Sequence, residues 1–258
     1  MRYLILFKAL LKQEFILMRR YLFNTIVSLI GIYIIFLLIF FGAHALGGGA
    51  PEFGATLDAI VVGFLVWTFA LFAYSDLAHG MVREAQEGTL EQLYMSPVGF
   101  TWVSLFRIVS RFWVMLTFNI MLLVLMMATT GRWLHLDVVS LLPLILLTLA
   151  GVYGIGFAIG GLALVFKRIE SFVQIFQFAM VGLIVAPVGR FPLLRYLPLA
   201  EGNRLIRRVM AEGLSIFELP ATDLLFLLAN SVLWFGLGFL AFKLLVNVAR
   251  DRGLLGHY

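Results

Sequence analysis

Six long apolar stretches constrain this 258-residue chain more than any other feature of its sequence. They run over residues 22–46, 57–79, 103–129, 138–166, 170–189 and 220–246. A helix needs roughly 20 residues to cross the hydrocarbon core of a bilayer. In lipid, only helices and closed barrels satisfy their own backbone hydrogen bonds, and continuous apolar runs of this length are typical of helices. We therefore expect an all-α polytopic membrane protein with one transmembrane domain over 1–258.

The composition agrees with a membrane protein and excludes several other classes. Hydrophobic residues make up 62% of the chain and charged residues 13%, whereas a soluble domain usually carries about a quarter charged residues. The net charge of +5 comes mainly from basic residues at the ends of the apolar stretches. A nucleic-acid partner is not expected, since no basic face on a soluble domain is visible. The lack of cysteine excludes disulfides and thiolate metal sites.

The distribution of lysine and arginine predicts the orientation of the helices, because these residues are enriched on the cytoplasmic side. With six spans and a cytoplasmic N-terminus, 13 basic residues lie inside and 6 outside. If 170–189 were re-entrant instead of spanning, the count would be 15 against 4. Charge alone favours five spans, but 170–189 is long enough to cross, so six are preferred. A multi-pass protein of the cell membrane is expected.

The first 21 residues predict an amphipathic helix that lies in the membrane interface. At 100° per residue, Lys8, Lys12 and Arg19 fall on one side, and apolar residues fill the opposite side. Glu14 projects from the apolar side. Either it reaches back to the lipid head groups, which is the preferred interpretation, or it meets a partner there.

A polar segment over 80–98 separates the second and third stretches. Gly88 should break a helix that runs down from the membrane, and Thr89 with Gln92 has capping-box spacing. Pro97 ends the short helix that this predicts. If the helix instead continues from Arg83, its glutamates share one narrow arc. Either way, an acidic element projects from the membrane, where an anionic leaflet would repel it.

This segment, "REAQEGTLEQLYMSPV" (Arg83–Val98), resembles the signature of membrane subunits of type-2 ATP-binding-cassette (ABC) exporters. The family typically shows a glutamate, then Gly-Thr-Leu-Glu, a hydrophobic pair and Ser-Pro. The resemblance extends to the layout. An N-terminal amphipathic helix precedes two spans in 22–79 and three spans in 99–189. A polar helical segment at 190–219 then leads to the sixth span and the C-terminal tail in 220–258.

The resemblance implies that 80–98 is a coupling helix that docks on an ATPase subunit. The implied coupling residues are Glu84, Glu87, Gly88, Thr89, Leu90, Glu91 and Leu93. It further implies a second permease copy or a related permease. No G-x-x-x-x-G-K-[ST] stretch occurs, so ATP and Mg would bind the partner subunit and no cofactor is expected in this chain.

The segment "YLPLAEGNRLIRRVMAEG" (Tyr196–Gly213) predicts a half-buried helix on the outer face, re-entrant or interfacial. Glu201, Arg204, Arg207, Arg208 and Glu212 gather on one side, with apolar residues on the other. The arginines are expected to meet lipid phosphates, with an anionic substrate as the alternative.

Polar side chains inside the spans are further candidates. Gln174 and Gln177 follow Glu170 along one stripe, and Asn119 and Asn230 lie deep in their spans. These four amides either bond across helices or line a substrate path or dimer seam. Gly156 and Gly160 have the small-xxx-small spacing of close helix packing. The Phe- and Leu-rich spans favour an amphiphilic cargo, such as a drug or lipid-like molecule.

Two other functions remain open from the sequence. A membrane enzyme would need a polar catalytic cluster, for which Asp76 and His79 are the one candidate pair, although a structural hydrogen bond is preferred there. An ion-driven secondary transporter would show internal repeats, and none is evident. No catalytic and no metal-ligating residue is expected.

Overall fold

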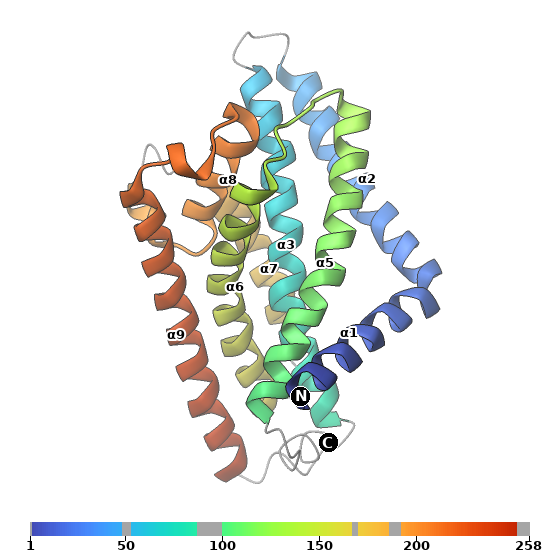
Figure 1. Ribbon diagram of the computed structural model, residues 1–258, viewed down its shortest axis with the longest axis vertical. Helices are drawn as coiled ribbons and strands as arrows, with labels where there is room; N and C mark the ends of the chain where they lie inside the picture. Colours follow the sequence, from blue (N-terminus) through green and yellow to red (C-terminus); the bar gives the residue numbers. More distant parts are fainter. Residues whose placement is uncertain (1, 48–52, 87–99, 167–169, 186–191, 252–258) are drawn as a thin grey trace.

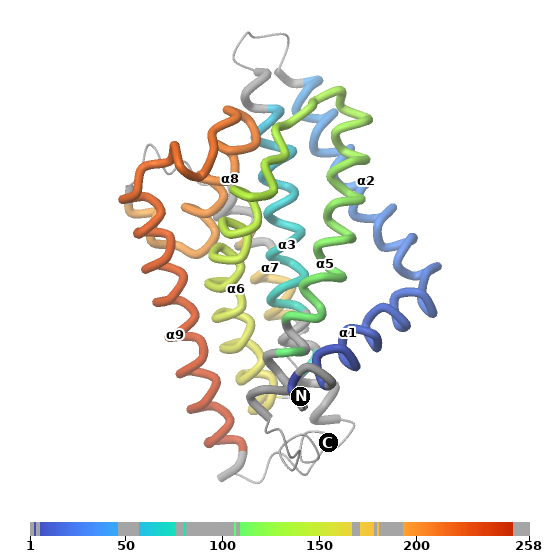
Figure 2. Tube along the Cα trace, in the orientation of Figure 1, coloured from blue at the N-terminus to red at the C-terminus, as the bar shows by residue number. Residues whose placement is uncertain are grey.

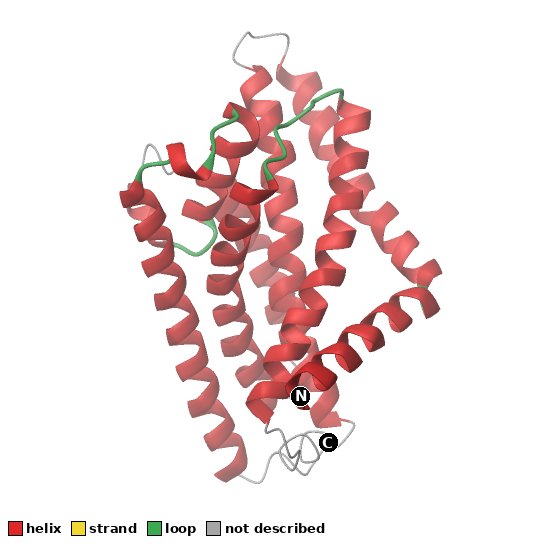
Figure 3. Cartoon of the chain, viewed as in Figure 1, coloured by secondary structure: helices red, strands yellow, loops and turns green. Residues whose placement is uncertain are grey.

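The computed structural model describes residues 2–47, 53–86, 100–166, 170–185 and 192–251 (Figure 1). Within these ranges every regular element is a helix (Figure 3). The elements are α1 (Arg2–Arg20), α2 (Leu22–Gly47), α3 (Phe53–Gln86), α5 (Phe100–Thr130), α6 (Val138–Phe166), α7 (Glu170–Val185), η1 (Pro192–Tyr196), α8 (Ala200–Glu212), η2 (Ile216–Glu218) and α9 (Ala221–Asp251). The prediction of an all-helical fold is confirmed for this part of the chain.

Five of these helices are long and apolar enough to cross a membrane. The apolar segments are Leu22–Ala45, Leu57–Ser75, Val109–Thr130, Val138–Phe166 and Ala221–Ala249. Helix α7 covers the remaining predicted span, but its 16 described residues are fewer than the roughly 20 that a crossing needs. The protein therefore has the helices of a membrane protein, and a sixth crossing stays a prediction.

The chain path defines two ends of the bundle (Figure 2). Helix α3 ends and α5 begins at one end, beside α1, and we call it the α1 end. At the opposite end α5 leads into α6. Helix α8 lies at that end too, as shown by the hydrogen bond that the amide of His135, in the α5–α6 connection, donates to the carbonyl of Met210 in α8 at 2.8 Å. We call it the α8 end. The basic segment that follows α7 thus lies opposite the end that carries α1.

Helix α3 forms the centre of the bundle. Of its spanning segment 72% is buried within the protein, against 17% for the peripheral helices α2 and α9. It packs against α2, α5, α6, α7 and α8. Its side chains Val61, Ala70 and Tyr74 are removed from the surface, so the apolar run is buried on nearly every side and no single apolar stripe marks it.

Helices α6 and α9 approach closely because glycines face each other across their contact. A Cβ atom on Gly238 would overlap the backbone of Gly154, and one on Gly154 would overlap the backbone of Trp234. The small-residue contact predicted for this stretch is therefore centred on Gly154. The predicted Gly156 and Gly160 are also buried in α6.

Helix α1 confirms a helix at the N-terminus, while its position in the membrane interface stays a prediction, and its contacts correct the role of Glu14. The apolar side of α1 packs on α5, where Phe7 meets the ring of Phe106 at 5.9 Å between centroids. Glu14 lies on this contacting side, and its Oε1 accepts a hydrogen bond from Nε of Arg111 at 3.2 Å. The preferred interpretation, that Glu14 reaches back to the head groups, is wrong because an arginine of α5 lies within reach.

Replacing Gly238 by alanine should destabilise the protein, because the added Cβ has no room against Gly154. Overpacking of this kind costs about 1–3 kcal/mol. The control is Gly236→Ala, two residues away on α9, where nothing lies within 4 Å of an added Cβ. Thermal unfolding in detergent should show a lower midpoint for Gly238→Ala and an unchanged or higher one for Gly236→Ala. Equal midpoints for the two variants would contradict the close α6–α9 contact.

Candidate functional site

The short helix η1 and the residue after it are bonded by side chains of α9. The indole Nε1 of Trp234 donates a hydrogen bond to the carbonyl oxygen of Tyr196 at 2.8 Å, and Nδ2 of Asn230 donates to the carbonyls of Arg195 and Leu197 at 3.5 Å each. Trp234 lies 13 residues after the first residue of α9, which is about 20 Å along a helix. The short helix η1 therefore lies beside the spanning part of α9, where α9 side chains bond its carbonyl groups.

Helix α8 packs closely against α6. A Cβ atom on Gly202 would overlap the side chain of Thr148, so the two helices touch at this glycine. The apolar side of α8, with Leu205, Ile206, Val209 and Met210, is buried as predicted. The helix ends at Gly213, whose φ of 73° suits a glycine and whose amide donates to the carbonyl of Val209.

The backbone is strained where η1 leads into α8. Leu199 has a φ of 72°, a conformation that disfavours side chains with a Cβ atom. Its side chain is only 3% exposed. Burial of this leucine offsets the unfavourable backbone, and the turn brings Arg195 of η1 beside the first turn of α8.

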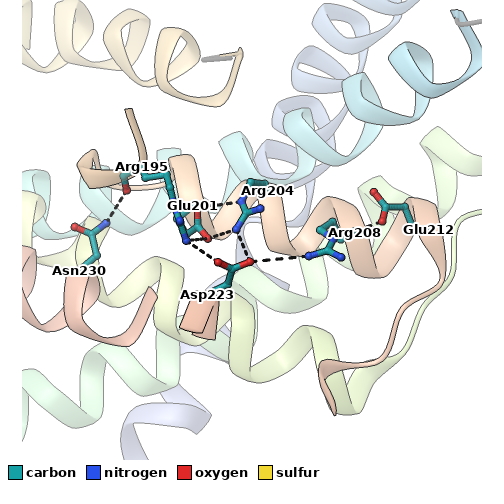
Figure 4. Close-up of polar contacts among 7 residues, drawn as sticks. All are labelled: Arg195, Glu201, Arg204, Arg208, Glu212, Asp223 and Asn230. Carbon is teal, nitrogen blue, oxygen red and sulfur yellow. Dashed lines mark hydrogen bonds and ion pairs between the residues drawn. The ribbon is translucent and has the colours of Figure 1, made fainter. Parts of the chain in front are cut away.

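A cluster of ion pairs joins η1, α8 and α9 (Figure 4). The side chain of Glu201 has no exposed surface and lies between two guanidinium groups. Arg195 donates to it through Nε and Nη2 at 2.9 Å each, and Arg204 donates through the same two atoms at 3.1 and 2.6 Å. Bidentate hydrogen bonds of this kind are among the strong interactions between an arginine and a carboxylate.

Asp223, in the first turn of α9, completes the cluster from the other side. Its Oδ1 lies 2.8 Å from Nη2 of Arg195, and its Oδ2 lies 2.7 Å from Nη2 of Arg204. Arg208 is farther away, with Nη1 at 4.0 Å from Oδ2, and its Nε lies 3.5 Å from the exposed Glu212. The cluster therefore ties η1 and α8 to α9.

The carboxylates stabilise the charged form of the arginines. Hydrogen bonds to Glu201 raise the pKa of Arg195 and of Arg204 above the ordinary value for arginine, and they outweigh burial, which acts in the opposite direction. Arg195 also lies over the ring of Phe226, with Cζ at 4.4 Å from the ring centre. Such stacking suits the flat guanidinium group.

Two of the predicted basic residues have partners within the chain. Arg204 and Arg208 pair with carboxylates, and contact of these arginines with lipid phosphates or an anionic substrate stays a prediction. Arg207 is exposed on α8. The sequence placed Glu201 among the arginines, but Asp223 was missed because it lies 28 residues from Arg195 and on another helix.

The two asparagines predicted inside the spans form contacts between elements. Asn119 is fully buried; its Oδ1 accepts a hydrogen bond from the hydroxyl of Thr68 on α3 at 2.5 Å, and its Nδ2 donates to the carbonyl of Met115. Asn230 bonds the backbone of η1. Gln174 is exposed on α7 and Gln177 is half-buried, so a role at a dimer seam or substrate path stays a prediction for them.

The predicted coupling residues lie mostly outside the described residues. Glu84 belongs to α3, which continues through Gly80 to Gln86, but its side chain is not described. The residues Glu87, Gly88, Thr89, Leu90, Glu91 and Leu93 fall in the range that the structure does not describe. The structure does not describe the side chains of Asp76 and His79 either, so their pairing stays untested.

No protein-family model matches the chain, and no curated protein matches it.

Replacing Glu201 by glutamine should destabilise the α8 end strongly. Removal of one partner from a buried ion pair costs about 3–5 kcal/mol, because the remaining charges lose their compensation. The matched control is Glu212→Gln, whose side chain is 53% exposed in its pair with Arg208 and should contribute no more than about 1 kcal/mol. Thermal unfolding of the two variants in detergent measures the difference. Similar midpoints would contradict a structural role for Glu201.

Proposed function

We propose that this chain is the membrane-spanning permease subunit of an ABC transporter that exports an amphiphilic molecule, driven by ATP hydrolysis on a separate subunit. The observation that carries the proposal is the motif of Glu87, Gly88, Thr89, Leu90 and Glu91, followed by Ser96-Pro97, between α3 and α5. In the proposed complex two permeases and two ATPase subunits assemble, with ATP and Mg bound to the ATPases.

The position of the motif supports a role in force transmission. It follows directly on α3, a helix of 34 residues, which is about 50 Å long. A displacement of the coupling segment acts on α3 and α5 without a long intervening linker. Since α3 packs against α5, α6, α7 and α8, a tilt of this central helix disturbs contacts at both ends of the bundle.

The α1 end offers a second element that would move with the coupling segment. Glu14 of α1 pairs with Arg111 of α5, and a Cβ atom on Gly80 of α3 would lie 3.3 Å from Nη1 of Arg111. Arg111 of α5 therefore reaches both α1 and α3, six residues before α3 ends at Gln86. Lys8 and Lys12 of α1 are exposed and suit contact with lipid head groups.

The proposal predicts that an ABC ATPase copurifies with the intact chain from its native membranes. The Glu87→Arg/Glu91→Arg variant should lose this partner, because the reversed charges oppose insertion of the coupling helix into the ATPase. The control is Arg207→Glu, a charge reversal at the exposed position on α8, which should retain the ATPase. The proteins bound to each variant are identified by mass spectrometry.

Two results would count against the proposal. Absence of an ATPase from the intact chain would remove the energy source of an exporter and return attention to Asp76 and His79. Retention of the ATPase by the doubly reversed variant would show that the acidic segment does not form the docking contact.

A further inference from the structure

Three arginines converge on the carboxylate of Asp223. Arg195 comes from η1, while Arg204 and Arg208 lie one turn apart on α8. All three side chains keep 28–32% of their surface exposed, whereas Asp223 keeps 14%. Part of each arginine side chain is therefore accessible from outside the cluster, and Asp223 of α9 contacts all three arginines (Figure 4).

The two central carboxylates differ in their relation to these arginines. Glu201 is fully buried and belongs to the same helix as Arg204. It accepts two hydrogen bonds from Arg195 and two from Arg204. Asp223 takes one nitrogen from each of the two arginines and comes from a different helix. Movement of α9 relative to α8 would withdraw Asp223 and leave Glu201 in place. The three arginines would then lack one of their counterions.

The distances indicate which anion suits the vacated position. A carboxylate has two oxygens, and those of Asp223 lie 2.8 and 2.7 Å from Arg195 and Arg204 but leave Arg208 at 4.0 Å. A phosphate monoester has three terminal oxygens, one for each guanidinium group. Arginine is well suited to phosphate, because its planar fork matches the geometry of two oxygens.

Apolar side chains adjoin the cluster. Phe226 lies under the guanidinium of Arg195, and the ring of Tyr196 packs on Phe226 with 5.2 Å between centroids. Tyr196 is 61% exposed, and Leu193 in the same short helix is 80% exposed. A molecule with its head group on the arginines would find an apolar surface for its tail along η1.

We propose that Arg195, Arg204 and Arg208 bind the phosphate head group of an amphiphile, and that the carboxylate of Asp223 occupies their site until such a head group displaces it. The proposal of this binding site rests only on contacts within the chain and does not depend on the proposed function. That the bound amphiphile is the exported cargo rests on the function proposed above.

The proposal is tested by binding to the purified chain in an uncharged detergent, without any ATPase. The probes are dioctanoyl phosphatidic acid, dioctanoyl phosphatidylcholine and inorganic phosphate. We expect phosphatidic acid to bind more tightly than the other two, because it alone combines a phosphate monoester with an apolar tail. Asp223→Asn should tighten its binding about tenfold, since the competing charge is removed while the side chain keeps its size.

Two arginine variants provide the matched comparison. Arg208→Gln should weaken binding of phosphatidic acid about tenfold, the loss expected for one charge-assisted hydrogen bond. Arg207→Gln removes the same charge from the neighbouring exposed position and should leave binding unchanged. If Asp223→Asn fails to fold, this pair of variants still decides the question.

Several outcomes would overturn the site. Equal weakening by Arg207→Gln and Arg208→Gln would show general attraction to a basic surface. A folded Asp223→Asn variant that binds no more tightly would show that Asp223 does not compete. Equal affinity for inorganic phosphate would remove the apolar part of the proposal. Absence of an ATPase in copurification would leave all these binding results intact and would affect only the identification of the amphiphile as cargo.

Discussion

The carboxylate of Glu201 lies fully buried between the guanidinium groups of Arg195 and Arg204, and the arrangement of the α8 end depends on this contact. A charge removed from water is tolerated only with close partners. Here each arginine supplies two donors, and Asp223 balances the second positive charge. The cluster thus links three elements that are separated along the chain: η1, α8 and α9.

The same segment must also satisfy backbone groups next to a spanning helix. Backbone groups beside an apolar helix need hydrogen-bond partners within the protein. Trp234 and Asn230 of α9 provide donors for the carbonyls of η1, and Gly202 lets α8 come close to α6. Side chains from two spanning helices therefore support η1 and α8, and the ion pairs determine how their polar faces are oriented.

Helix α3 connects this end of the bundle with the α1 end. It packs against α8 and α6, and its last residues lead toward the segment with the acidic motif. The function proposed above would need such a connection, because movement of the coupling segment at one end would have to change contacts at the other. The cluster around Glu201 and the contact of α1 with α5 lie at opposite ends of this helix and are the contacts that its movement would strain.

The sequence predicts the elements of this fold better than their contacts. Apolar runs predict α2, α3, α5, α6 and α9 because crossing a bilayer imposes length and composition, and the two-sided pattern of residues 201–212 predicts α8. Asp223 and Arg111 were missed as partners, since their ion pairs join helices far apart in the chain and no local spacing reveals them. Asn230 was identified as important, but its acceptors are backbone carbonyls, which carry no sequence signal.

The most direct test of this account is to crosslink η1 to α9 in native membranes. The chain has no cysteine, so Tyr196→Cys with Phe226→Cys introduces the only two thiols, at positions whose rings lie 5.2 Å apart. A short bismaleimide should join this pair, as detected by mass spectrometry of the digest. Tyr196→Cys with Val248→Cys should not be joined, because Val248 lies about 21 Å farther along α9 than Trp234, the residue that bonds the carbonyl of Tyr196. Joining of the second pair, or failure of the first, would contradict the placement of η1 beside α9.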